Sequence, residues 1–159
     1  MSGAEESDAR MGLVYDEALR SIAQQQASVE ALRSRVGTLL SAASISTAFL
    51  GAQALANRTP GQWGLLAMVS FVAVVGVSIA IMWPYEWIFR RSPKAILREY
   101  IDHNEPLVMP AIQRDLALHL EDHYDRNERK LNRLLRVFEA GCAVLALEVV
   151  AWLVELRRR

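Results

Sequence analysis

The sequence has little of several residue types on which common functions depend. Its 159 residues include a single cysteine, Cys142, which excludes an intrachain disulfide and a metal cluster held by cysteines. It also lacks a glycine-rich phosphate loop, a nucleophile elbow and a CxxC pair, so we expect no enzyme activity and no cofactor. Basic and acidic residues balance at 18 each, which argues against nucleic-acid binding as the main role.

The sequence also has few lysines and no signal-peptide pattern, and these two features bear on its source and location. Only two of the 18 basic residues are lysines, an arginine bias that is common in proteins from GC-rich bacterial genomes. The first 35 residues are polar and charged and lack the apolar run and small-residue cleavage site of a signal peptide. Any membrane insertion must therefore depend on internal segments.

Charged residues are missing from two internal stretches, 36–56 and 63–84. Twenty-one helical residues span roughly 31 Å at about 1.5 Å each, close to the ~30 Å of a bilayer hydrocarbon core. Between the stretches, residues 57–62 (NRTPGQ) contain Pro and Gly, which break helices. The sequence therefore predicts a transmembrane hairpin over residues 36–84.

Aromatic and basic residues flank the second stretch. Aromatic side chains favour the headgroup depth of a bilayer, and arginines favour the cytoplasmic side. The predicted membrane-interface anchors are Trp63, Trp83, Trp87, Arg90 and Arg91.

Small residues share one broad face of the first stretch on a helical wheel. Small side chains allow close helix contact in lipid, and hydroxyl groups can bond across helices. This face therefore suits helix packing, or alternatively the lining of a water-filled path. Its members are Gly37, Ser41, Ser44, Thr47, Ala48, Gly51 and Ala52.

The residues before the hairpin are predicted to form a flexible tail over 1–12 and an amphipathic helix over 13–35. Apolar residues recur at intervals of seven at Tyr15, Ile22, Val29 and Val36. This spacing fits a coiled coil, but so short a pattern equally fits a solvated helix with one apolar stripe.

Residues 85–136 after the hairpin are dense in charge and are predicted to form a cytoplasmic helical region. Ser92-Pro93 is a typical helix start, and this helix should end near Pro106. Pro110 is predicted to begin a long final helix that continues into the last apolar segment.

The last apolar segment, residues 137–156, contains three glutamates: Glu139 near its start, Glu148 in its interior and Glu155 near its end. Nine Val, Leu and Phe side chains in residues 137–155 contribute about −4 kcal/mol to insertion, and a central Glu148 opposes it by roughly 3 kcal/mol. We therefore predict a third transmembrane helix. The alternative is a two-helix hairpin with residues 137–156 packed as a cytosolic helix.

The distribution of arginine and lysine predicts the orientation. Fourteen of the 18 basic residues lie before residue 36 or between residues 84 and 137. The positive-inside rule then places the N-terminus and residues 85–136 in the cytoplasm, at a bacterial plasma (inner) membrane. Three spans would send Arg157, Arg158 and Arg159 outside, against that rule.

Glu148 is the main candidate for a functional residue, because an ionisable group at membrane depth indicates an ion path, a proton site or an interhelix partner. Ser44 and Thr47 are its expected partners. A structural hydrogen bond made by a neutral glutamic acid is the alternative. His119 and His123, one helical turn apart, are weak metal-ligand candidates on what is otherwise a solvated helix.

Three stretches resemble small bacterial membrane proteins of antiphage defence: ALRSRVGTLLSAASISTAFLGA, IMWPYEWIFRR and HYDRNERKLNRLLRVFEAG. In pattern and order they resemble the Pycsar transmembrane effector family, with the SLATT-type membrane proteins as neighbours. The chain departs from that pattern at Arg35-Val36, where a Lys-Ala pair is expected. The resemblance implies a helical effector that a nucleotide signal triggers to assemble and damage the membrane.

Together these observations predict an all-α integral membrane protein with three transmembrane helices and long cytoplasmic helices. We expect a self-associating homo-oligomer in the lipid bilayer, a membrane-perturbing or pore-forming effector of antiviral defence gated by its cytoplasmic helices. Its trigger would be a cyclic nucleotide or a cytoplasmic protein. The alternatives are a passive anchor that docks a soluble partner through residues 85–136 and a subunit of a larger transporter.

Overall fold

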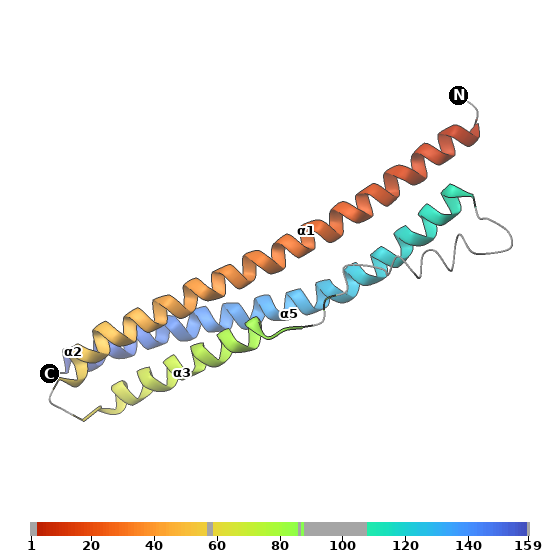
Figure 1. Ribbon diagram of the computed structural model, residues 1–159. Helices are drawn as coiled ribbons and strands as arrows, with labels where there is room; N and C mark the ends of the chain where they lie inside the picture. The colour runs from red at the N-terminus through yellow and green to blue at the C-terminus, as the bar shows by residue number, and fades with distance from the viewer. Residues whose placement is uncertain (1–2, 57–58, 86, 88–107, 159) are drawn as a thin grey trace. The chain divides into compact units, whose positions relative to one another are not determined.

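The computed structural model describes residues 3–56, 59–85, 87 and 108–158, with side chains from residue 9 onward, and the regular structure of these residues is entirely helical. The predicted anchors Arg90 and Arg91 and the predicted helix from Ser92 lie outside this part of the chain. The elements are α1 (Gly3–Ser46), the π-helix η1 (Thr47–Gly51), α2 (Ala52–Leu55), α3 (Gln62–Met82) and α5 (Met109–Arg157) (Figure 1).

Three of these helical stretches are long and apolar enough to cross a membrane, as judged by length and composition. They are Ala9–Leu55, Gln62–Met82 and Met109–Arg157. The predictions of an all-α fold and of three such helices are therefore confirmed for the described residues.

The first helix begins earlier than predicted. The sequence predicts a tail over residues 1–12 and a helix from residue 13, whereas α1 begins at Gly3. Alanine, glutamate, arginine and methionine are frequent in this stretch, and all four favour helices. Acidic residues near the N-terminus also interact favourably with the helix dipole. The predicted start of the last helix is close to the observed one, since Pro110 is the second residue of α5.

The chain divides into two compact units. Unit 1 consists of residues 1–29 and 85–131, and unit 2 consists of residues 30–84 and 132–159. The first half of α1 and the first half of α5 belong to unit 1. Their second halves belong to unit 2, together with η1, α2 and α3.

In unit 1, one face of α1 packs against α5. Ile22, Gln25 and Val29 are buried on this face. Gln25 Nε2 donates a hydrogen bond to the backbone oxygen of Tyr124 on α5, at 3.0 Å, and Asn127 on α5 is buried as well. Polar side chains in an apolar seam fix the register of two helices at some cost in stability.

Unit 2 is a bundle of three helical segments in which α5 runs antiparallel to α3. A Cβ added at Gly141 of α5 would lie 3.2 Å from Leu39 of α1 and 2.9 Å from Val77, near the end of α3. Further along α5, Glu155 bonds to Gly61, at the start of α3. Residues 141–155 of α5 therefore accompany α3 over most of its length.

Two apolar clusters form the core of unit 2. One consists of Leu39, Ala43 and Val74, and the other of Ala54, Ala67, Ala151 and Trp152. Alanines predominate in the second cluster, which lets the helix backbones approach closely.

The seven-residue spacing in α1 corresponds to a packed seam. Ile22, Val29 and Val36 are 6%, 5% and 0% exposed, which favours coiled-coil packing over a solvated helix with an apolar stripe. A matching seven-residue repeat in α5, not identified from the sequence, consists of Asn127, Leu134, Gly141 and Glu148, all of them buried.

Candidate functional site

A cluster of three hydrogen-bonded side chains, Thr47, Glu148 and Trp152, lies inside unit 2 where η1 meets α5. Glu148 is 0% exposed. The hydroxyl of Thr47 donates a hydrogen bond to Glu148 Oε1 at 2.6 Å, and the indole Nε1 of Trp152 donates one to Thr47 Oγ1 at 3.3 Å. The three side chains form a relay from indole to hydroxyl to carboxyl, which we call the Thr47–Glu148–Trp152 triad.

Local backbone geometry brings the triad together. Glu148 and Trp152 are four residues apart, so they share one face of α5. Thr47 is the first residue of the π-helix η1, and π-helical turns inside α-helices occur frequently at functional sites. Gly51, at the end of η1, allows the Trp152 ring close access, since a Cβ there would lie 3.2 Å from the ring.

The carboxyl group of Glu148 keeps one oxygen without a hydrogen-bond partner among the described residues, Oε2. The residues of α3 that pass through unit 2 carry no charge, and α1 has no charged residue after Arg35. A buried polar atom without a partner raises the free energy of the packed state. The triad therefore has unused hydrogen-bonding capacity that water or another polar group would satisfy.

Glu155, the last glutamate of the apolar segment, stabilises the start of α3. The backbone amides of Gly61 and Gly64 donate to Glu155 Oε1 at 3.0 Å and to Oε2 at 3.1 Å. The first amides of a helix have no partner within it, and a carboxylate there also interacts favourably with the helix dipole. A Cβ on Gly61 would lie 2.8 Å from Glu155 Oε1, so any larger residue at this position would make the carboxylate shift.

An aromatic contact joins the same two chain segments. The guanidinium carbon of Arg158 lies 5.5 Å from the centroid of the Trp63 ring, within the range of a cation–π interaction. Together with Glu155, this contact connects the end of α5 to the start of α3.

The structure separates the polar residues that the sequence placed on one face. Thr47 contacts Glu148, as expected, but Ser44 does not. Ser41 and Ser44 are exposed, and their hydroxyls donate to carbonyl oxygens of their own helix, to Gly37 at 2.9 Å and to Leu40 at 2.8 Å. The predicted shared face therefore consists of an inner part, with Thr47 and the buried Gly51, and an outer part with the serines.

The predicted interface anchors take different positions. Trp83 is 62% exposed at the end of α3, whereas Trp63 and Trp87 are partly buried.

Among the described residues, the histidine pair belongs to no group that could hold a metal ion. His119 Nδ1 lies 2.9 Å from the backbone oxygen of Asp115 in the preceding turn. The part of the chain that the structure describes contains no group of three or more His, Cys, Asp or Glu side chains able to hold a metal ion.

Trp152 and the capping role of Glu155 were not identified from the sequence. A signal for Trp152 was present, because tryptophan favours membrane interfaces and this one stands one turn after an acidic residue on the same helix face. No comparable signal existed for Glu155, since its amide partners lie more than 90 residues away.

Searches of protein-family models, curated proteins and solved structures find no match to this chain.

Proposed function

We propose that this protein is an integral membrane protein with three spans that self-associates and perturbs the bilayer. The observation that carries the proposal is the distribution of side chains in unit 2, where many large apolar residues face outward and small or polar residues make up much of the interior. A protein dissolved in water normally buries its large apolar residues. In lipid, small interior residues promote helix contact.

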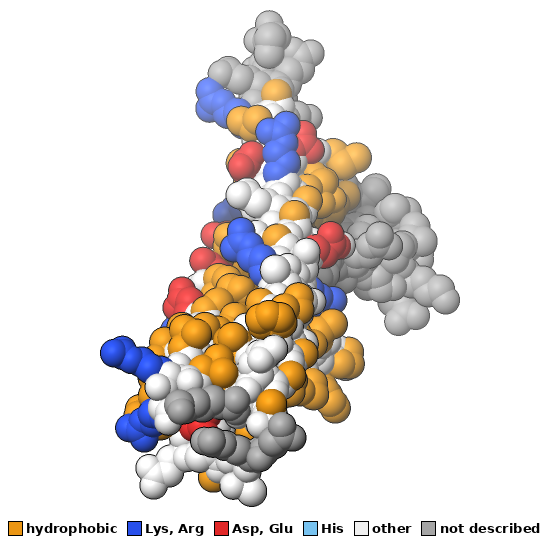
Figure 2. Space-filling model, turned by 90° about the vertical axis from the view of Figure 1, so that its left-hand side faces the viewer, with side chains coloured by type: hydrophobic (Ala, Val, Ile, Leu, Met, Phe, Trp, Pro, Cys, Tyr) orange, Lys and Arg blue, Asp and Glu red, His pale blue; other side chains and the backbone are white. Residues whose placement is uncertain are grey.

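The exposed fractions of individual side chains in unit 2 support this distribution. Ile45 is 69% exposed, Phe49 68% and Val72 67%, and hydrophobic side chains cover much of the unit 2 surface seen in Figure 2. The buried small or polar residues of unit 2 include Ala43, Gly51, Ala54, Gly64, Ala67, Ser70, Ser78, Gly141, Glu148 and Ala151.

The course of α5 supports three spans rather than two. Because α5 accompanies α3 from Val77 to Gly61, a bilayer around α3 would also surround residues 141–155. The orientation we propose has the N-terminus and residues 85–136 in the cytoplasm of a bacterial inner membrane, as the arginine distribution favours.

A labelling experiment tests the number of spans. In a Cys142→Ala background, single cysteines at Leu13, Gln62 and Arg157 are treated with a membrane-impermeant maleimide on intact cells. Three spans predict that Gln62→Cys and Arg157→Cys react before lysis, and that Leu13→Cys reacts only after lysis. Protection of Arg157→Cys together with Leu13→Cys would contradict three spans and support the two-helix hairpin.

The mechanism we propose begins with contact between copies through the outer serine face. Ser41, Ser44 and Ala48 are exposed, so they can meet another chain without any rearrangement. We propose that this contact shifts α1 against α5 and opens the Thr47–Glu148–Trp152 triad to a water-filled path. Hydration of Glu148 Oε2, which has no partner among the described residues, would favour the open state.

Dye release from liposomes tests this mechanism. Purified protein at a high protein-to-lipid ratio, which drives self-association without the trigger, should release carboxyfluorescein from phosphatidylethanolamine–phosphatidylglycerol vesicles. Glu148→Leu should lower the rate on the order of tenfold, the effect of ~1.4 kcal/mol, because it removes the group that water would stabilise. Glu148→Gln should retain most of the release.

The matched control is Leu147→Ala, an exposed neighbour of Glu148 that should leave the release unchanged. Equal release by the wild type and by Glu148→Leu would remove the triad from the mechanism. No release above that of empty vesicles would favour the passive anchor.

The role in antiviral defence rests on the resemblance to the Pycsar transmembrane effector family. In that role a cyclic nucleotide or a cytoplasmic protein would act on unit 1 and trigger self-association. In this proposal the cytoplasmic helices of unit 1 respond to the trigger, and unit 2 damages the membrane.

A further inference from the structure

Four arginines from two helices lie at one level of unit 2. Leu39 of α1 lies against Gly141 of α5. Further along both helices Thr47 bonds to Glu148, so α1 and α5 run parallel here. Counted back from the contact of Leu39 with Gly141, the arginines lie about 6–12 Å along the helix axes in the same direction. They are Arg33 and Arg35 on α1 and Arg133 and Arg136 on α5, all of them exposed.

The end of α3 lies at the same level. Val77 of α3 also lies against Gly141, and α3 runs antiparallel to α5. Trp83, six residues after Val77, is therefore about 9 Å from that contact, on the side of the arginines. Its side chain is 62% exposed. Exposed tryptophan beside arginine is typical of the headgroup region of a bilayer.

The distance from this level to the other end of unit 2 matches a bilayer. Arg136 precedes Glu155 by 19 residues of α5, which is about 28 Å of helix, and a hydrocarbon core is ~30 Å thick. Glu155 bonds to the start of α3 at that other end. Exposed apolar side chains such as Ile45 and Val72 lie between the two ends. In the proposed bilayer the four arginines therefore lie at the depth of the lipid phosphates.

The guanidinium groups at this level exceed the carboxylates near them. None of the four forms an ion pair with a carboxylate among the described residues, and Arg136 Nε donates to the backbone oxygen of Asn132 at 3.4 Å. In unit 2, Glu30 and Glu139 lie within one helical turn of them along the chain, so four positive charges stand against two negative ones. Guanidinium groups bind phosphate through paired hydrogen bonds, so this surplus suits a ligand that carries phosphate.

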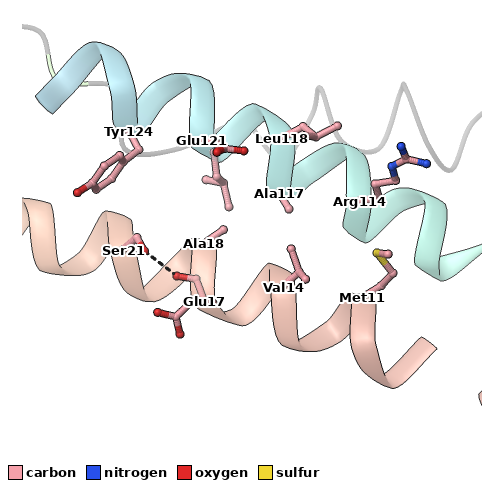
Figure 3. Close-up of a pocket in the computed structure, with 11 residues that line it drawn as sticks. Met11, Val14, Glu17, Ala18, Ser21, Arg114, Ala117, Leu118, Glu121 and Tyr124 are labelled. Carbon is pink, nitrogen blue, oxygen red and sulfur yellow. Dashed lines mark hydrogen bonds between the residues drawn. The ribbon is translucent and has the colours of Figure 1, made fainter. Parts of the chain in front are cut away.

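Arginines in unit 1 have acidic residues beside them instead. Arg20 lies 3.7 Å from a carboxylate oxygen of Glu17. Figure 3 shows Arg114 on the same stretch of α5 as Glu121, and both line a groove to which Glu17 also belongs. The positive charge of these arginines is therefore partly neutralised within unit 1.

We propose that an arginine belt binds the phosphate groups of anionic phospholipids; the belt consists of Arg33, Arg35, Arg133 and Arg136. Clusters of basic residues next to transmembrane helices attract anionic headgroups. A lipid rather than a soluble phosphate is the expected ligand, because the belt lies where the exposed apolar surface ends. The inference rests on the proposed membrane location of unit 2, but it does not require that the protein perturbs the bilayer.

Native mass spectrometry of the purified full-length chain tests the proposal. The chain in non-ionic detergent micelles is titrated with phosphatidylglycerol, which is anionic, or with phosphatidylcholine, which has no net charge. We expect phosphatidylglycerol to bind on the order of tenfold more tightly. Replacing the four belt arginines with glutamine should remove this preference and leave the binding of phosphatidylcholine unchanged. Replacing them with lysine should keep a preference for phosphatidylglycerol, because the charge remains.

The matched control removes the same number of positive charges from unit 1. It combines Arg10→Gln, Arg20→Gln, Arg114→Gln and Arg126→Gln, and it should retain the affinity for phosphatidylglycerol. Circular dichroism checks that each variant remains helical; if the glutamine variant of the belt unfolds, the wild type and the lysine variant decide. Equal affinities of the wild type for the two lipids would overturn the proposal. A loss in the control as large as that in the belt variant would overturn it as well.

Inorganic phosphate separates the two sources of this chemistry. Added at constant ionic strength, it should not displace phosphatidylglycerol; displacement would assign the belt to a soluble phosphate and overturn the lipid proposal. The proposed function can fail separately. Selective binding of phosphatidylglycerol without dye release would contradict the perturbation of the bilayer and support the belt. Dye release with equal lipid affinities would overturn the belt alone.

Discussion

Replacing Trp152 with alanine is expected to lower the free energy of unfolding of the whole chain by about 3 kcal/mol. Trp152 is 1% exposed and packs with Ala54, Ala67 and Ala151. These neighbours are alanines, whose side chains are too short to fill the cavity. In the bilayer that we propose as the surroundings of unit 2, the transfer part of the loss is small, and the lower end of the usual range for tryptophan then applies.

The measurement is unfolding by sodium dodecyl sulfate in mixed micelles, followed by circular dichroism. Trp83→Ala is the matched control, because Trp83 is 62% exposed and its removal leaves no cavity. Thr47→Val adds a second comparison, since it removes the hydroxyl that links Trp152 to Glu148 and keeps the packing volume. Equal losses for the two tryptophan variants would contradict the packing of Trp152 described here.

Replacing Gly141 with leucine is expected to separate α3 from α5, with a loss of about 1–3 kcal/mol. Already the first side-chain carbon at this position would lie 2.9 Å from Val77 Cγ1 and 3.2 Å from Leu39 Cδ2. The valine methyl group has little freedom to move, because a β-branched side chain in a helix keeps one rotamer. The helices must therefore move apart, which disturbs the contact of Glu155 with the start of α3.

Gly76→Leu is the matched control for this substitution, because nothing lies within 4 Å of a Cβ added there. Both variants introduce the same side chain into an apolar helix, so differences in helix propensity largely cancel. Their stabilities are compared in the same micelle titration. A loss for Gly76→Leu as large as that for Gly141→Leu would show that the effect does not arise from the contact between the helices.

The serine residues show why the sequence did not settle the candidate site. A helical wheel groups Ser44 with Thr47, and both were expected partners of Glu148. Three residues separate Thr47 from Ser44, which is about 60° on a helical wheel, so the two side chains share a broad face without pointing at the same neighbour, and the π-helical turn begins only at Thr47. Ser44 precedes the turn and remains exposed, and its hydroxyl bonds to its own helix.

The sequence by itself determined the class of this protein, its three apolar helices and the polar character of Glu148. These properties depend on composition and on the length of uncharged runs, which are local. Only the tertiary structure decided that α1 and α5 share a seam, that Trp152 completes the triad and that Glu155 caps α3. Each of these contacts joins residues more than 90 positions apart, and such pairings depend on the packing of whole helices rather than on any local pattern.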